Sequence, residues 1–333
     1  MFGKHSKNIA LFLIMAFIIA LMSFFLPDKF LTVVNFQSMA SQIPEFGLLA
    51  IAMMIALITG GIDLSVVSIT SLTGVVSALI LKQFTNTQIG GASIFFTITM
   101  AILAAIVLSM FCGFINGFLI ANVGVPPILA TLGTQGLFLG IAIIITHGHG
   151  ISTFPEKFLF IGSGKISIIP MPLIIFIVCT LLVALILKKT SLGISMYMVG
   201  SNPIAARFSG INNDGILIRT YIITGLLAGV SSIIMISRVN SIRPGYGYAY
   251  LLQAILVAVL GGTDPSGGFG SVLGVVMGIV ILQVLQSGFN ILAFSPFFKK
   301  FIWGLMLLLV MIINFVIARY LQRVKKLKIS TSV

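Results

Sequence analysis

The residues best suited to chemistry occur in two short stretches, 56–65 and 257–266, that share the pattern Gly-Gly-x-Asp-x-Ser. Paired glycines release a helix from its regular dihedral angles, and an Asp or Ser just beyond them can cap the helix that follows. Glycine-interrupted apolar segments at matching places in two halves of a chain indicate a transport pathway. The alternative is a pair of ordinary turns at a membrane surface. The matching positions are Gly60 with Gly261, Gly61 with Gly262, Asp63 with Asp264 and Ser65 with Ser266.

Asp63 and Asp264 are the only acidic residues that we expect near the interior of the apolar segments. The other four acids fall in loops or at the edge of a segment: Asp28, Glu45, Glu156 and Asp214. A carboxylate in the middle of a bilayer costs about 2.5 to 3.5 kcal/mol on insertion scales, so it needs a partner or a cap. Capping of the following helix is the least costly role for both acids. We expect the two copies to run in the same direction.

Six polar residues lie within or beside apolar runs and are candidates for lining a substrate path: Asp63, Asn116, Thr131, Gln135, Gln283 and Asn290. Side chains of this kind can bind a polar solute inside a membrane. Each could equally join neighbouring helices, where one such hydrogen bond contributes about 0.6 kcal/mol on average. The sequence leaves the two roles open for each residue.

Motifs for catalysis and metal binding are missing from the sequence. The stretch 162–165 resembles the end of a phosphate-binding loop, but Leu159 and Ile166 stand where that motif needs Gly and Ser or Thr. His147 and His149 offer two ligands, whereas a catalytic zinc site usually has three from the protein. We therefore expect no catalytic residue, no metal and no cofactor, and no ATP hydrolysis by this chain alone.

The elements that position these residues are predicted to be membrane-spanning helices. Of the 333 residues, 59% are hydrophobic and 8% are charged, whereas a soluble domain carries about 25% charged residues. This composition excludes a soluble enzyme. An alternating strand pattern is absent, so we predict an all-α polytopic membrane protein, a single domain over 1–333, with helices broken at the Gly-Gly-x-Asp motifs. The apolar runs predict about ten transmembrane helices, at 9–26, 44–61, 63–81, 93–121, 127–146, 170–187, 216–237, 249–262, 270–293 and 299–319.

Small residues recur at every fourth position in two of these runs. Gly113 and Gly117 form one such face, and 270–278 holds another. Small residues at this spacing let helices approach closely. We expect tight helix packing at both faces, and we expect Cys112 and Cys179, which lie in apolar runs, to pack as small hydrophobic residues.

The formal net charge of +13 indicates topology and not a nucleic-acid partner. The basic residues lie in short loops and tails, with five between Arg319 and Lys328. Lys and Arg collect on the cytoplasmic side of spans, which predicts cytoplasmic N- and C-termini. The first run, 9–26, is longer than a signal-peptide core and lacks a cleavage site, so we expect an uncleaved span.

Two predicted loops are longer than simple connectors, 147–169 and 188–215. The second is the most polar stretch of the chain and falls on the cytoplasmic side of the predicted topology. It predicts a docking surface for another protein. A solvated connector is the alternative.

Four motifs, in the same order over nearly the whole chain, resemble the ribose-type permeases of bacterial ABC sugar importers, in the branched-chain amino acid and sugar permease superfamily. One motif alone would be weak evidence, but four in register are specific. They are Thr59-Gly60-Gly61-Ile62-Asp63-Leu64-Ser65; Gly124-Val125-Pro126 with Ala130-Thr131-Leu132-Gly133-Thr134; Gly200-Ser201-Asn202 through Ala205-Ala206-Arg207 to Ser209-Gly210-Ile211-Asn212; and Gly261-Gly262-Thr263 with Gly267-Gly268.

The resemblance implies a multi-pass permease subunit of the bacterial cytoplasmic (inner) membrane. Its implied partners are a second permease copy, a cytoplasmic ATP-binding subunit and a periplasmic or lipid-anchored sugar-binding protein. The loop 188–215 would carry a short coupling helix near 203–208 that inserts into the ATPase, and Pro203 suits the first turn of such a helix. The matching coupling residues are Gly200, Asn202, Ala205, Ala206, Arg207, Ser209 and Gly210.

Two departures from the family pattern bear on docking detail and on the identity of the sugar. Ser201 stands where a second glycine is usual, and Leu139 or a neighbour stands where an arginine is common. The resulting hypothesis is a subunit that moves a monosaccharide, a ribose-like pentose or a hexose, by alternating access, with ATP hydrolysed on a separate subunit. The alternatives are an ABC permease for autoinducer-2, nucleosides or branched-chain amino acids, or a proton-coupled secondary transporter that uses Asp63 and Asp264.

Overall fold

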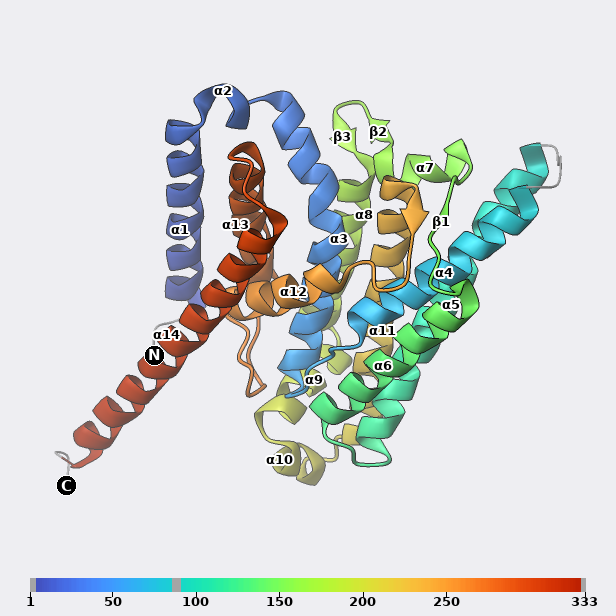
Figure 1. The fold of residues 1–333 in the computed structure, drawn as a ribbon. Helices are drawn as coiled ribbons and strands as arrows, with labels where there is room; N and C mark the ends of the chain where they lie inside the picture. Colours follow the sequence, from blue (N-terminus) through green and yellow to red (C-terminus); the bar gives the residue numbers. More distant parts are fainter. Residues whose placement is uncertain (1–3, 86–90, 331–333) are drawn as a thin grey trace.

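The computed structural model describes the backbone of residues 4–85 and 91–330, and it is a bundle of helices (Figure 1). Two short antiparallel strand pairs close loops: β1 (Ile151–Ser152) with β4 (Ser241–Ile242), and β2 (Lys165–Ile166) with β3 (Ile169–Pro170). The predicted all-α class is confirmed. The helices are α1 (Lys4–Phe25), α2 (Pro27–Phe30), α3 (Val33–Ile58), α4 (Val66–Thr85), α5 (Gly91–Ala121), α6 (Pro127–Thr146), α7 (Glu156–Ser163), α8 (Met171–Lys189), α9 (Ser191–Ser201), α10 (Pro203–Phe208), α11 (Asn213–Val239), α12 (Tyr248–Leu260), α13 (Val272–Ile291) and α14 (Pro296–Ser330).

Seven helices in the described part of the chain are long and apolar enough to cross a membrane: α3, α4, α5, α6, α8, α11 and α13. Each of the ten predicted apolar runs falls on a helix. The eighth run is shorter than a span, because α12 has 13 residues and is therefore about 20 Å long. The hydrocarbon core of a bilayer is about 30 Å thick, so α12 alone does not cross it.

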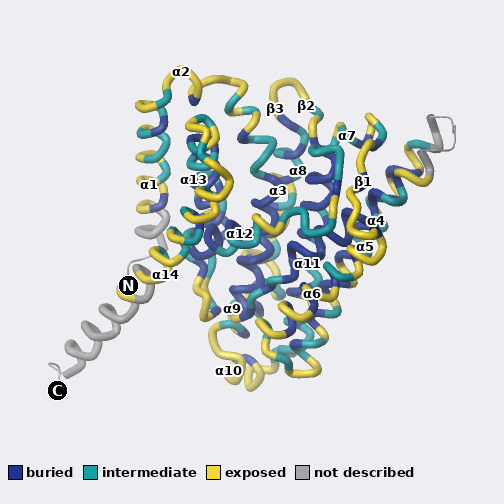
Figure 2. Tube along the Cα trace, viewed as in Figure 1, coloured by how far each residue is buried: buried dark blue, intermediate teal, exposed yellow. Residues whose placement is uncertain are grey.

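Helix α3 is the centre of the bundle. Every residue from Pro44 to Ile58 is buried, and α3 contacts α8, α11, α12 and α13. A helix that is apolar on all sides lies in a protein core or spans a membrane, and here neighbouring helices surround this part of α3. Figure 2 shows this buried column continuing into α4 and α11.

Helices α5 and α11 cross at close range because glycines line their contact. A methyl group on Gly117 would lie 2.7 Å from the Cα atom of Ile218, and one on Gly225 would lie 3.2 Å from Gly113. The predicted close packing at Gly113 and Gly117 is therefore present. This approach brings the side chains of α11 near the turn between α3 and α4.

Helix α10 projects from one end of the bundle, and α1 begins and α14 ends on the same lower side of Figure 1. Helix α7 and the strand pairs lie toward the opposite end. The side chains of Lys4, Lys7 and the basic residues between Arg319 and Lys328, on which the predicted topology partly depends, lie outside the described residues.

Candidate functional site

The first helix break follows Ile58, where α3 ends in a glycine turn. Gly60 has a φ of 79°, a left-handed conformation that glycine adopts without a steric penalty. The Gly61 N–H donates to the carbonyl of Ala56 at 3.1 Å, and the Gly60 N–H donates to Leu57 at 2.9 Å. This pair of hydrogen bonds satisfies the last carbonyls of the helix and stops α3 inside the protein.

Asp63 lies in the turn between α3 and α4 and is fully buried. Its Oδ1 accepts hydrogen bonds from the N–H of Ser65 at 3.1 Å and from the Ser65 hydroxyl at 2.7 Å. Its Oδ2 accepts one from the Thr224 hydroxyl of α11 at 2.7 Å. The predicted cap is thus a local turn: Asp63 holds the residue just before α4, and its described hydrogen bonds do not reach the first-turn amides of that helix.

The polar network around Asp63 extends into α5 and α6. The Asn116 amide donates to the Ser65 hydroxyl at 2.7 Å, and the Thr134 hydroxyl donates to Asn116 Oδ1 at 2.6 Å. The Thr131 hydroxyl donates to the carbonyl of Ile62 at 3.1 Å. We call Asp63, Ser65, Asn116, Thr134 and Thr224 the Asp63 network.

The burial of the Asp63 network determines what it can contact. Asp63, Asn116 and Thr131 have no exposed surface, and Thr134 is 5% exposed. Side chains enclosed in this way do not touch a solute in this conformation. The arrangement ties the first break to three neighbouring helices, and three of the six predicted path residues meet within it or beside it.

The second helix break follows Leu260 and has a related geometry. The Thr263 N–H donates to Ala258 at 3.1 Å and the Gly262 N–H donates to Val259 at 3.0 Å, as in the turn after α3. Asp264 Oδ1 accepts from the N–H of Ser266 at 2.9 Å. The acid turns therefore match in the two copies.

The two copies differ in register and in burial. The left-handed glycines are Gly60 and Gly262, which the ungapped alignment does not pair. Asp264 is exposed, so the expectation that it lies in the interior is wrong. The physical reason is the length of the turn: α13 begins only at Val272, whereas α4 begins at Val66, directly after the Asp63 turn.

Both breaks meet the end of α9 at a contact between glycines. The Gly268 N–H donates to the carbonyl of Ile58 at 2.9 Å. A methyl group on Gly267 would lie 2.9 Å from the Cα atom of Gly60, and one on Gly200 would lie 2.8 Å from the Gly268 nitrogen and would overlap the Ile58 carbonyl. We call Gly60, Gly200, Gly267 and Gly268 the glycine junction.

Helix α12 contacts α3 and lies across it in Figure 1. Tyr250, near the start of α12, has its ring centroid 6.4 Å from that of Phe46 in α3, and the turn after α12 reaches Ile58 at the end of α3. The long turn after α12 therefore brings Gly267 and Gly268 to the end of α3, although the two helices are not aligned.

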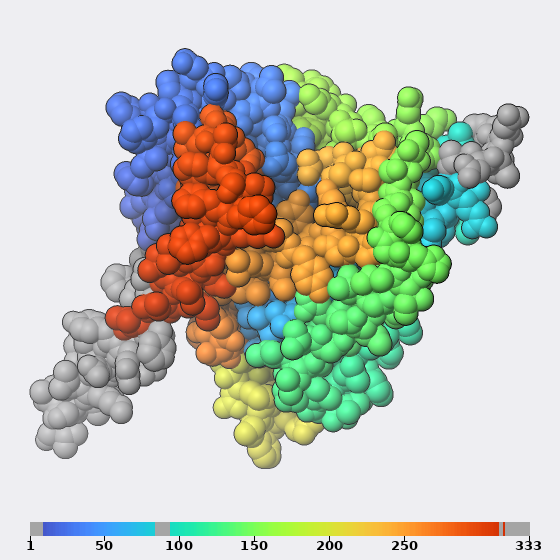
Figure 3. Space-filling view, viewed as in Figure 1, coloured from blue at the N-terminus to red at the C-terminus, as the bar shows by residue number. Residues whose placement is uncertain are grey.

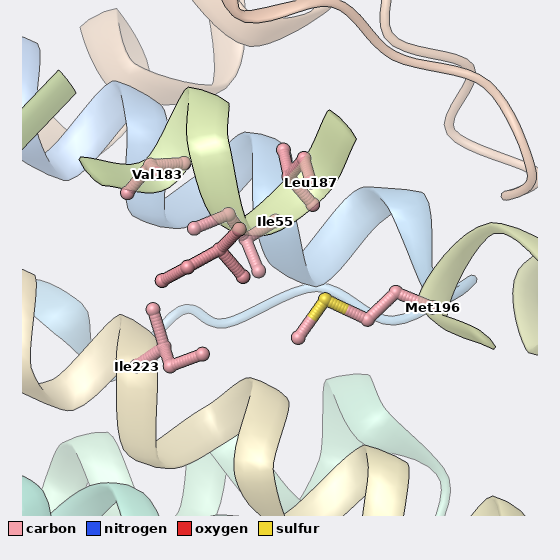
Figure 4. Close-up of a pocket in the computed structure, with 6 residues that line it drawn as sticks. Ile55, Val183, Leu187, Met196 and Ile223 are labelled. Atoms are coloured by element: carbon pink, nitrogen blue, oxygen red, sulfur yellow. The ribbon is translucent and has the colours of Figure 1, made fainter. Parts of the chain in front are cut away.

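Helix α9 is held against the junction by apolar and polar contacts. Met196 faces Ile55 of α3, Leu187 of α8 and Ile223 of α11 across a small gap (Figure 4). The Tyr197 hydroxyl donates to the carbonyl of Gly270 at 3.0 Å. Burial raises the pKa of Tyr197, which keeps it a neutral donor. A shift of α9 would therefore move the turn that follows α12.

Helix α10 forms directly beyond α9, at the predicted residues Pro203–Phe208. The Asn202 side chain caps it by accepting from the N–H of Ala205 at 3.0 Å. Gly210, with a φ of 79°, ends it, and the Ser209 hydroxyl donates to Ala205 at 2.9 Å. Ala206 is buried. Most of the predicted coupling residues therefore shape this short helix.

The outward face of α10 is apolar. Ile204 is 69% exposed and Phe208 is 90% exposed, and both border a hollow of about 320 Å³. Arg207 lies beside them, 3.6 Å from Asp214, in an exposed ion pair that contributes at most about 1 kcal/mol. Exposed apolar residues on a projecting helix indicate a contact with another protein.

The remaining predicted path residues do not belong to the Asp63 network. Gln135 is buried on α6. Gln283 is buried on α13, and neither its Oε1 nor its Nε2 atom has a hydrogen-bond partner in the described part of the chain. Asn290 is exposed and accepts a hydrogen bond from the Lys299 ammonium.

Sequence reasoning missed a second buried acid, Glu45, which is 1% exposed. The prediction placed it at the edge of a segment, but α3 begins at Val33, and Glu45 lies about halfway along it. The Arg238 guanidinium donates to both carboxylate oxygens of Glu45, and the Tyr250 hydroxyl donates to Oε2 at 2.6 Å. The Arg238 guanidinium compensates the buried charge of Glu45. No local sequence pattern predicts this pair, because the two residues are far apart in the sequence.

These features define a class: a polytopic α-helical membrane protein in which the turns after two helices meet close to a short projecting helix. The chain belongs to the family described as branched-chain amino acid transport system / permease component, whose model matches residues 35–311. The family assignment covers most of the chain.

Curated relatives extend over nearly the whole sequence. The ribose import permease protein RbsC of Escherichia coli strain K12 is 33% identical over 301 residues, 89% of this chain and 90% of the relative. The L-arabinose transport system permease protein AraH of the same strain is 30% identical over 325 residues, 98% and 94% of the two chains. RbsC of Bacillus subtilis strain 168 is 31% identical over 300 residues, 90% of each. No solved structure matches this chain.

Proposed function

We propose that the chain is the membrane subunit of an ATP-driven importer that carries a monosaccharide across the bacterial cytoplasmic membrane. The supporting relatives are named as permeases for ribose, L-arabinose and D-allose. The family description also names branched-chain amino acids, but these three sugar permeases favour a pentose or hexose.

The observation that carries the proposal is the link between α10 and the two helix breaks. α10 offers Ile204 and Phe208 to a partner. It is joined through one residue to α9, and α9 packs on both breaks at the glycine junction. A push on α10 therefore moves backbone at both breaks, which is what coupling to a separate ATPase needs.

The proposed orientation places α10 in the cytoplasm, where it docks on the ATP-binding subunit. Helices α1 and α14 begin and end on that side, consistent with cytoplasmic termini. A second permease copy and a periplasmic or lipid-anchored sugar-binding protein complete the importer. Transport of autoinducer-2 or nucleosides would use the same architecture with a different binding protein.

A proton-coupled secondary transporter is less consistent with the positions of the two acids. Asp264 is exposed, and its carboxylate accepts a hydrogen bond from Ser266 within its own turn. Asp63 is enclosed by hydroxyl donors and is closed to solvent in this conformation. Two acids that carried protons together would need a shared aqueous route, and these two occupy different surroundings.

The experiment that tests the proposal is reconstitution of the permease with its ATPase in liposomes. Each candidate binding protein is added with and without its sugar, and ATP hydrolysis is measured. We expect one sugar-loaded binding protein to stimulate hydrolysis. If every loaded binding protein leaves hydrolysis at its basal rate while the complex is intact, the proposal is wrong.

Charge reversal at Arg207 tests the docking surface. Arg207→Glu places a carboxylate beside Asp214 on an exposed helix, so the fold should persist while ATPase binding weakens about tenfold, the effect of losing about 1.4 kcal/mol. Co-purification of the ATPase with the tagged permease measures it. Arg219→Glu, a reversal at another exposed arginine near the start of α11, is the matched control. Equal ATPase recovery with both variants would contradict α10 docking.

A further inference from the structure

The segment between α11 and α12, residues 240–247, consists of β4 followed by irregular backbone over 243–247, and this irregular part lies level with the middle of α3. Just beyond it, Tyr250 bonds to Glu45, which lies about halfway along the 26 residues of α3. The Gly245 N–H donates to the Ser71 hydroxyl of α4 at 3.0 Å, and Gly245 and Gly247 adopt positive φ. Non-helical backbone at this depth is tolerated where it is buried in protein or lines a water-filled cavity.

A buried ionic cluster fixes this segment at both ends. Arg238, one residue before the end of α11, and Tyr250, in the first turn of α12, both donate to Glu45. Both flanking helices are thereby anchored to the same carboxylate in α3. The segment between them is a loop held on a rigid base, as a binding site requires.

Three polar side chains extend from this base: Arg243, Tyr246 and Tyr248. Arg243 and Tyr248 are exposed, Tyr248 at 40%, and Tyr246 is half-buried. Within the described part of the chain, the side chains of these three residues make no hydrogen bond or ion pair. An arginine at membrane depth faces protein or water and not lipid. An aqueous space beside these side chains would satisfy the guanidinium of Arg243.

The surface of the segment 240–247 and of α12 is exposed. Figure 3 shows this surface, coloured orange, between the surface of α6 and that of α14. The Tyr246 phenol lies within electrostatic reach of Glu45, Arg238 and Arg243. Arg243 and Tyr246 therefore occupy one neighbourhood beside the ionic cluster.

The functional groups of Arg243, Tyr246 and Tyr248 suit a neutral ligand with a ring that carries several hydroxyl groups. Tyrosine offers an apolar face for C–H groups and a hydroxyl that both donates and accepts. The guanidinium of Arg243 adds several donors in a fixed plane. Arg238 is neutralised by Glu45, so one unpaired positive charge remains, fewer than the arginine cluster typical of sites that recognise a phosphorylated ligand.

We propose that Arg243, Tyr246 and Tyr248 form a subsite that binds a neutral monosaccharide in a water-filled path through the membrane. This rests on the proposed function as a sugar permease. The subsite differs from the path residues predicted from sequence, which are largely enclosed in the protein.

Cysteine accessibility tests the subsite without any ATPase. Tyr248→Cys is made in a full-length chain with Cys112→Ala and Cys179→Ser, and cells are treated with a charged, membrane-impermeant maleimide. We expect labelling, and we expect D-ribose, L-arabinose or D-allose to slow it about tenfold at a concentration about ten times the dissociation constant. Val107→Cys, exposed in the middle of α5, is the control, which should stay unlabelled because it faces lipid.

Three outcomes overturn the subsite. These are no labelling of the Tyr248→Cys variant in a correctly inserted chain, no protection by any of the three sugars, and protection by inorganic phosphate equal to that by sugar. The last outcome would assign the three side chains to an anion.

A transport measurement separates failure of the subsite from failure of the proposed function. Tyr248→Ala is reconstituted with the ATPase and the loaded binding protein that stimulates the wild type. We expect sugar uptake per ATP hydrolysed to fall about tenfold, the effect of losing about 1.4 kcal/mol of contact, with stimulated hydrolysis retained. Arg219→Ala is the control with both activities unchanged. Unchanged uptake in Tyr248→Ala contradicts the subsite, whereas absence of stimulation in the wild type contradicts the importer itself.

Discussion

The first and second helix breaks use the same local chemistry in opposite surroundings. Each ends a helix with a left-handed glycine, and each closes an Asp turn onto the N–H of a serine two residues later. Asp63 is then enclosed by hydroxyl donors from α11 and from its own turn, whereas Asp264 is exposed. A shared motif therefore specifies a turn, and its neighbours decide whether that turn is a fixed part of the bundle or a loop at its edge.

The comparison suggests a division of roles at the glycine junction. The first break is held by α5, α6 and α11 through the Asp63 network. The second break is held by backbone contacts with Ile58 and Gly200, by the close packing of Gly261 on α13, and by the Tyr197 hydroxyl, without a buried polar network. We infer that the first break is the fixed partner and the second is the one that moves when α9 moves.

The largest difference between the two breaks is expected when the buried acid, Asp63, is removed. Asp63→Ala leaves the hydroxyls of Ser65 and Thr224 without their acceptor, so we expect a loss of about 3 kcal/mol or more in the free energy of unfolding. Asp63→Asn keeps part of the bonding and should lose less, and should disturb yield more than sugar preference. Thermal unfolding in detergent, followed by fluorescence of the single tryptophan Trp303, measures the loss. A normal unfolding temperature with an altered sugar profile would contradict the structural role.

A smaller effect is expected from crowding the junction. Gly200→Ala places a methyl group against the Ile58 carbonyl and 2.8 Å from the Gly268 nitrogen, and such overpacking costs about 1 to 3 kcal/mol. We expect the variant to fold and to bind the ATPase, but to couple ATP hydrolysis poorly to uptake.

The control for this crowding is Gly136→Ala, because a methyl group there meets no atom within 4 Å. Uptake per ATP hydrolysed is measured for both variants in proteoliposomes. Equal uptake per ATP hydrolysed in the two variants would show that the glycine junction does not transmit movement from α9 to the breaks.

The smallest effect is expected at the exposed acid. Asp264→Ala removes one hydrogen bond within a solvent-facing turn, so the free energy of unfolding should change by about 0.5 kcal/mol or less, as at other surface positions. The comparison with Asp63→Ala is made in the same unfolding experiment. A loss at Asp264 as large as that at Asp63 would remove the distinction between the breaks.

Sequence patterns placed every predicted apolar run on a helix, because long apolar runs have few alternatives in a membrane, but the run 249–262 forms a helix of 13 residues that is too short to span. They located both breaks and the short helix at 203–208, since Gly pairs, Asn202 and Gly210 carry local stop and cap signals. The burial of the acids was harder to predict. Asp264 and Asp63 look alike in sequence, and the difference depends on where the next helix begins.

The polar clusters depended on contacts that no local pattern reveals. Glu45 and Arg238 are 193 residues apart, and Thr224 reaches Asp63 across 161 residues. The sequence showed Asn116 and Thr131 as polar residues in apolar runs, but only the packing of α5 and α6 against the turn between α3 and α4 brings them to their partners. Long-range partners of this kind need the fold itself.

The most direct test of the importer is sugar uptake into proteoliposomes that hold the permease, its ATPase and an ATP-regenerating system, with the loaded binding protein at the membrane domain's proposed outer face. An uncoupler is added while the ATP concentration is held constant. We expect uptake to continue at its original rate, because ATP acting through α10 drives the two breaks. Collapse of uptake with the proton gradient, at unchanged ATP, would contradict the importer and favour proton coupling.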